Sequence, residues 1–177
     1  AEPVDEHDAS AIFGGICGVL RSLIRHRKDL IKPCLPHLTE ILSQQWRLLS
    51  HVSSAHTGMA IERQIHASMP CWLNMVVSPL GLDAAQAFRR VLSELAGKTS
   101  VIHVSKKAKP HTPNMNETLA KSMTKHAVYI LVAYARCVTM PHTTIPPNLR
   151  REIMTGLFAL CYICGAFERD AAMKSML

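Results

Sequence analysis

Residues 127 to 135 read AVYILVAYA, and this run indicates the class of fold. It lies inside a longer segment, from about Asn116 to Met140, whose apolar side chains recur at helical spacing. A helix that is apolar on nearly all sides is normally covered by several neighbours, so we expect this one to be central. Nine apolar residues are too few to cross a membrane.

Helical periodicity continues on both sides of this run. The first predicted helix covers about residues 9–32, with the apolar face Ile12, Ile16, Val19, Leu20, Leu23, Leu30 and Ile31. Further helices are predicted up to about residue 50 and over 59–78, 84–95 and 147–167, the last with Phe167 on its apolar face. No segment has convincing strand alternation. The sequence therefore predicts an all-α fold of stacked helical hairpins.

Two details of the first helix need an explanation. Gly14, Gly15 and Gly18 lie inside it and suggest close packing rather than a phosphate-binding loop. Arg27 projects onto the apolar stripe, so we expect its side chain either to find a buried acidic partner or to extend to solvent.

Charge divides the chain unevenly. Residues 1–8 form a flexible acidic lead-in, and residues 9–177 form a single helical domain with a long basic loop at about 98–116. The whole chain carries +7, and without the lead-in 20 basic and 9 acidic side chains remain, which gives +11. Such a field favours anionic partners such as RNA, DNA or acidic protein tails, without choosing among them.

Two groups of basic residues are the candidate binding sites, for phosphates or for acidic tails. Four side chains of the first helix form a ridge opposite its apolar face: Arg21, Arg25, Lys28 and Lys32. Six lysines face one acid across residues 98–125: Lys98, Lys106, Lys107, Lys109, Lys121 and Lys125. That region has no Phe, Tyr or Trp, so contact with phosphates is indicated and base stacking is not.

The sequence offers no catalytic or metal-binding motif. The pair Cys161 and Cys164 is the only Cys-x-x-Cys, lies within a predicted helix and lacks the second pair of a structural zinc site. The six cysteines read as free thiols of a reducing compartment, in the cytosol or nucleus. We therefore expect no catalytic residue, no metal, no cofactor and no enzyme activity, although a site could still be assembled in three dimensions.

Several stretches together resemble one protein family. They are residues 20–30 (LRSLIRHRKDL), 87–95 (AFRRVLSEL), 125–134 (KHAVYILVAY) and 145–160 (IPPNLRREIMTGLFAL). They are similar to the C-terminal domain of the nucleolar pre-ribosomal RNA processing family called unhealthy ribosome biogenesis protein two. The similarity extends from about residue 12 to 177 and is weakest over 51–80.

The resemblance implies a fragment of a HEAT/armadillo-like α-solenoid in the nucleus and nucleolus. It implies action early in assembly of the large ribosomal subunit, in a complex with other assembly factors that include an RNA helicase, and no catalytic activity. We therefore expect a non-catalytic scaffold domain that docks these factors, with pre-rRNA as a further candidate partner. The family domain would continue past Leu177, so apolar surface near that end would contact the rest of the parent protein. No membrane contact is implied.

Two alternatives stay open at this point. The chain could be a general RNA-binding helical module, which steep salt dependence of binding would favour. It could also be a helical protein-interaction adaptor outside ribosome assembly, which failure to localise to the nucleus would favour.

Overall fold

The computed structural model describes residues 6–52, 80–97, 119–139 and 143–176. This part of the chain is all-helical apart from one two-residue strand pair, so the predicted class is confirmed. Its elements are α1 (Glu6–His26), α2 (Lys28–Ile31), η1 (Lys32–Cys34), α3 (Leu35–Leu49), β1 (His51–Val52), α5 (Leu82–Ala96), α6 (Leu119–Met123), α7 (Ala127–Thr139), β2 (Thr143–Thr144), α8 (Pro147–Ile163) and α9 (Ala166–Met176). The predicted helix at 59–78 and the basic loop at 98–116 lie outside these residues.

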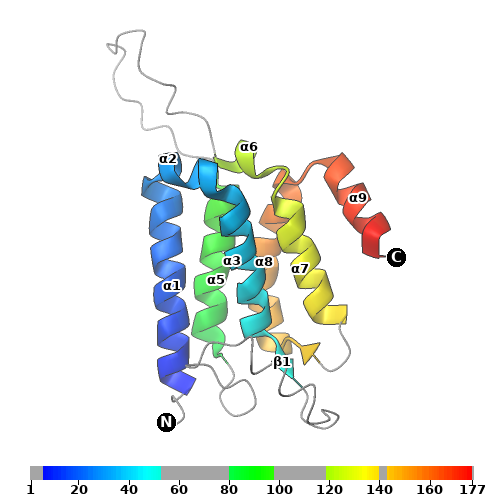
Figure 1. Cartoon of the computed structure of the whole chain (residues 1–177). Coiled ribbons are helices and arrows are strands. Elements are labelled where there is room, and N and C mark those ends of the chain that lie inside the picture. Colours follow the sequence, from blue (N-terminus) through cyan, green and yellow to red (C-terminus); the bar gives the residue numbers. More distant parts are fainter. Residues whose placement is uncertain (1–5, 53–79, 98–118, 140–142, 177) are drawn as a thin grey trace.

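The helices are arranged around α5. Helix α5 packs most extensively against α8 and next against α1, while α3 packs against α7. Figure 1 shows α1, α5 and α8 behind α3 and α7. Strand β1 pairs antiparallel with β2, with His51 opposite Thr144, and this pair joins the ends of α3 and α7. None of the described helices is long and apolar enough to span a membrane.

A chain of aromatic rings joins these helices at the centre. The ring centroids of Phe13 on α1 and Phe88 on α5 are 6.2 Å apart, and those of Phe88 and Trp46 on α3 are 4.8 Å apart. Trp46 then meets Tyr134 on α7 at 5.0 Å. Phe13, Trp46 and Phe88 are fully buried. Four helices therefore share one aromatic centre, although aromatic residues make up only 5% of the chain.

Helices α5 and α8 approach closely because Gly156 has no side chain. A Cβ atom at Gly156 would lie 2.9 Å from the Cβ of Leu92 and 3.1 Å from the backbone oxygen of Arg89. Carbon atoms in favourable contact are about 3.5–4.0 Å apart. A glycine is therefore required at this position for the observed spacing of the two helices.

The first helix differs from the prediction in length and in the face it buries. Helix α1 ends at His26, and Arg27 has φ −128° and ψ 51°, outside helical geometry. The buried stripe is Ala9, Phe13, Cys17, Leu20 and Ile24. Ile12 and Val19, predicted on the apolar face, are 40% and 62% exposed. The predicted face is therefore confirmed only in part: Leu20 and Ile31 are buried, and Ile16 and Leu23 are half-buried against the core. Ile12, Val19 and Leu30 are exposed, because the row that α1 buries is displaced from the one predicted.

The break at Arg27 has a physical cause. A continuous helix would place this guanidinium on the buried stripe, where an unpaired charge is costly. The break instead turns Arg27 to solvent, where it forms an ion pair with Asp29 at 3.0 Å. Of the two outcomes expected for Arg27, extension to solvent is therefore the one observed. Arg27 also has an acidic partner, Asp29, but this partner is exposed and not buried.

The three glycines of α1 do not serve close packing. A Cβ atom placed on Gly14, Gly15 or Gly18 would meet nothing within 4 Å among the described residues. That prediction was therefore wrong, and these glycines lie on the open sides of the helix.

The two later helices are each interrupted. The segment predicted as one helix over 116–140 contains α6, a turn at Thr124–His126, and α7. Helix α7 is not the central one: Tyr129 is 61% exposed and residues 131–135 are half-buried, because α5 occupies the centre. The helix predicted over 147–167 ends at Ile163, and Phe167 lies on α9 with 81% exposure.

Candidate functional site

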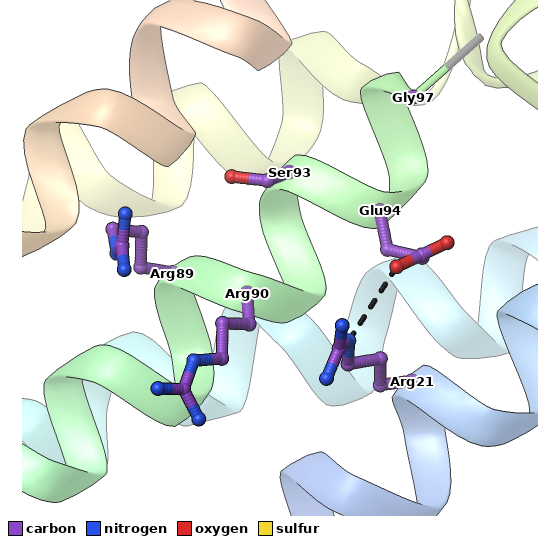
Figure 2. Close-up of a pocket in the computed structure, with 6 residues that line it drawn as sticks. All are labelled: Arg21, Arg89, Arg90, Ser93, Glu94 and Gly97. Carbon is purple, nitrogen blue, oxygen red and sulfur yellow. Dashed lines mark hydrogen bonds and ion pairs between the residues drawn. The ribbon is translucent and has the colours of Figure 1, made fainter.

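A pocket of about 220 Å³ opens on the outer side of α5, between α1 and α8. Its lining comes almost entirely from α5 and is strongly basic: Arg21, Arg89, Arg90, Ser93, Glu94 and Gly97. Figure 2 shows Arg21 reaching from α1 toward Glu94, and Arg89 and Ser93 on the opposite side of α5. Residues four apart on α5 form one row, so the periodicity of a single helix brings most of these groups together.

Glu94 anchors α1 to this pocket. The Nε of Arg21 donates to its Oε2 at 3.4 Å, and Arg25 donates from Nε and Nη2 to its two oxygens, both at 3.2 Å. One carboxylate therefore holds two guanidinium groups. The Arg21 contact uses only Nε, so its terminal nitrogens are not used in that contact.

Arg89 and Arg90 differ in their surroundings. Arg89 lies 3.0 Å from Glu152 on α8, measured from Nε to Oε1, but this nitrogen makes no aligned hydrogen bond within the described residues. Arg90 is exposed and has no ion-pair or hydrogen-bond partner in the part of the chain that the structure describes. Around the pocket, four arginines thus face two carboxylates, which leaves the site positively charged.

The ten predicted basic residues are only partly brought together. Arg21 and Arg25 lie beside the pocket, but α1 ends at His26, so Lys28 belongs to α2 and Lys32 to η1. The continuous ridge on one helix was therefore a wrong prediction. Lys121 is exposed on α6 and Lys125 is exposed in the turn after it. The remaining predicted residues lie outside the described residues: Lys98, Lys106, Lys107 and Lys109.

Of the six lining residues, the sequence interpretation identified only Arg21 as a candidate site residue. Arg89, Arg90, Ser93 and Glu94 lie in the stretch AFRRVLSEL, which was quoted only for its family resemblance, and Gly97 follows it. A signal existed, because Arg89 and Ser93 share one row of α5 while Arg90 and Glu94 share the next. The pairing of Glu94 with Arg21, 73 positions away, had no local signal.

A second surface feature is apolar and lies on α8 and α9. Phe158 and Tyr162 are 65% and 83% exposed and stand four residues apart, on the side of α8 opposite its buried residues. Phe167 and Met173 on α9 are also exposed. We call Phe158 and Tyr162 the aromatic face. Phe167 was predicted on the apolar face of the helix at 147–167, so its exposure was missed. Phe158 and Tyr162 lie off that predicted face.

The described residues show no metal-binding cluster of histidine, cysteine or carboxylate side chains. Burial raises the pKa of the Cys17 thiol to about 12. Burial also raises the pKa of Cys161 and Cys164, although Cys161 is only half-buried. Raised pKa values keep these groups as thiols at neutral pH, the opposite of what a thiolate nucleophile or metal ligand needs.

A model of the Urb2/Npa2 family matches the chain over residues 1–177. The chain belongs to the Urb2/Npa2 family. This confirms the family resemblance. Urb2/Npa2 proteins are ribosome biogenesis factors and not a known enzyme family, and their role suggests a nuclear location. Neither a search of curated proteins nor a search of solved structures found a match.

Proposed function

We propose that this Urb2/Npa2 chain is a non-catalytic scaffold domain of a nucleolar factor that assembles the large ribosomal subunit and processes pre-rRNA. Its role is to dock other assembly factors, among them an RNA helicase, and to lie close to pre-rRNA. Membership of a ribosome biogenesis family supports the process, and the exposed aromatic face supports the docking.

The aromatic face is the observation that carries this proposal. Exposed aromatic side chains are the residues most often found at the energetic centre of protein interfaces. Helix α9 adds to this, since among its described side chains only Glu168 is even half-buried. A helix of 11 residues is marginally stable in water on its own, so a partner that covers α9 would stabilise it.

The charges on α8 and α9 indicate the chemistry of the partner. One acidic side chain, Asp170, is exposed on these two helices, against four exposed basic side chains: Arg150, Arg151, Arg169 and Lys174. Opposite charges across an interface steer association and fix its register. We therefore infer an amphipathic protein segment with apolar anchors and acidic flanks, supplied by another assembly factor.

A stacked, HEAT/armadillo-like arrangement is part of the same proposal. Its support is that α1, α5 and α8 lie in one layer while α3 and α7 lie in the other. Stacked hairpins offer extended surfaces for several partners, as a scaffold requires.

The test is affinity purification of the tagged chain from nuclear extract, with and without ribonuclease, read by mass spectrometry. We expect identified large-subunit assembly factors to survive ribonuclease and to be lost from the double variant Phe158→Ser, Tyr162→Ser. The matched control is Val19→Ser, which removes a side chain of similar exposure (62%) from α1. Circular dichroism checks that each variant is folded.

Other outcomes favour the alternatives. Loss of the assembly factors on ribonuclease treatment would contradict direct docking and favour a general RNA-binding module. Retention by the double variant would exclude the aromatic face. A tagged chain that fails to enter the nucleus would point to an adaptor outside ribosome assembly.

A further inference from the structure

The pocket on α5 combines groups that recognise phosphate. Arg90 is exposed at its edge with no partner among the described residues, and the terminal nitrogens of Arg21 are not used by its contact with Glu94. Ser93 supplies a hydroxyl from the neighbouring row of α5. A guanidinium presents two parallel N–H groups that match two phosphate oxygens, and it stays charged at all physiological pH values.

The lining also indicates what the pocket does not bind. Among the described residues its lining has no apolar side chain: three arginines, one serine, one glutamate and one glycine. Protein segments depend on apolar anchors for most of their binding energy, and these six residues offer no apolar side chain to bury one against. The described lining also has no aromatic ring on which a base could stack. Charge and donated hydrogen bonds are what remain.

We propose that this pocket binds a phosphodiester group of an RNA backbone, with Arg90 as the principal donor and Arg21 as the second guanidinium of the site. Because the site reads no base, binding should be independent of RNA sequence. The proposal deepens the proposed function, since it names the anion that a ribosome biogenesis factor meets through this surface. It gives the chain an RNA contact separate from the aromatic face.

Glu94 and Glu152 limit the affinity of the pocket and fix its geometry. Glu94 holds Arg21 and Arg25 in place, and Glu152 holds Arg89 from α8. A pre-positioned guanidinium loses less conformational freedom when a phosphate arrives. The two carboxylates also keep the unoccupied arginines from repelling one another across the α1–α5–α8 layer.

The test compares variants of the whole 177-residue chain for binding to fluorescein-labelled poly(U) and poly(A) 20-mers by anisotropy, at several salt concentrations. Arg90→Ala is expected to weaken binding about tenfold for both RNAs. It should also reduce the slope of log K against log salt by about 0.7, the loss of one phosphate contact to a single strand. Arg90→Lys keeps the charge but loses the paired donors, so it should recover only part of the affinity.

The matched control is Arg136→Ala, which removes another exposed arginine, from α7, a helix with no residue among the described lining of the pocket. We expect it to change affinity less than about twofold, since charges beyond about 8 Å are screened at physiological salt. Equal losses for Arg90→Ala and Arg136→Ala would overturn the site and leave only diffuse attraction. Arg90→Ala is also tested with a labelled polyglutamate peptide. If this variant lost binding to the peptide while its RNA binding stayed unchanged, the phosphate site would be overturned in favour of a site for an acidic protein segment.

This experiment is independent of the test of docking. RNA binding that depends on Arg90 while the aromatic-face variant still retains assembly factors would contradict the docking surface alone. RNA binding insensitive to Arg90, with docking lost from that variant, would contradict the phosphate site alone.

Discussion

The close approach of α5 and α8 makes a quantitative prediction for Gly156→Ala. The new Cβ would lie 2.9 Å from the Leu92 Cβ and 3.1 Å from the Arg89 backbone oxygen. Neither atom is the free end of a flexible side chain, so the two helices themselves must separate. The shortfall from ordinary carbon–carbon contact is at least about 0.6 Å.

Two opposing terms set the size of the effect. Replacing glycine by alanine inside a helix stabilises a protein by about 1 kcal/mol. Overpacking a close contact costs about 1–3 kcal/mol. Part of this cost arises because separating the helices opens gaps at their other contacts, and a gap of about 0.5–1 Å loses about a quarter to a half of the attraction of each contact. We therefore expect Gly156→Ala to lower the free energy of unfolding by about 0–2 kcal/mol.

The matched control is Gly18→Ala, because a Cβ there meets nothing within 4 Å and the propensity term is the same. It should raise stability by about 1 kcal/mol, or Tm by about 2–4 °C for a chain of this size. The difference between the two variants, measured by urea denaturation, isolates the close contact and should be about 1–3 kcal/mol. Equal stabilisation by both would refute the reasoning.

Two further predictions concern buried side chains. Trp46→Ala should cost about 3–5 kcal/mol by urea denaturation, whereas Trp46→Phe should cost much less, because the buried Nε1 makes no hydrogen bond within the described residues; equal costs would contradict this. For Cys17, the folded pKa of about 12 exceeds the unfolded value of 9.0, so its contribution to stability is complete below pH 9 and is lost as pH rises toward 12. Between pH 8 and pH 11 the free energy of unfolding should therefore fall by about 2–3 kcal/mol less for Cys17→Ala than for the natural chain. Equal falls for the two proteins would exclude this contribution of Cys17.

Helical periodicity predicted much of the fold where a helix has a wide, well-separated apolar face. The apolar side expected for the helix at 84–95 is Ala87, Phe88, Val91, Leu92 and Leu95; in α5 the last four are buried and Ala87 is half-buried. Such faces can be read from the chain because neighbours three and four apart decide them. The same reasoning was less successful for α1, because the apolar residues of α1 are spread over more of the helix circumference than those of α5. Periodicity alone could therefore not decide which row of α1 side chains is buried.

The candidate site was predictable only in part. Arg21 and Arg25 were identified from their spacing, but their partner Glu94 lies about 70 positions away. This pairing is an outcome of packing between helices and leaves no mark in a local pattern. Exposure of Phe158 and Tyr162, in contrast, agrees with the sequence, because both lie off the apolar side predicted for the helix that contains α8.

The sequence by itself determined the all-helical class, the positive charge and the family, because composition, spacing and motif order are carried by the chain alone. Only the tertiary structure decided that α5 and not α7 is central, that the helix breaks at Arg27, and that Arg21, Arg90 and Ser93 share one pocket. The physical reason is that local periodicity says which side of a helix is apolar, whereas the position of each helix minimises the energy of contacts between distant segments. Gly156 shows this most directly, since its lack of a side chain matters only because Leu92 lies against it.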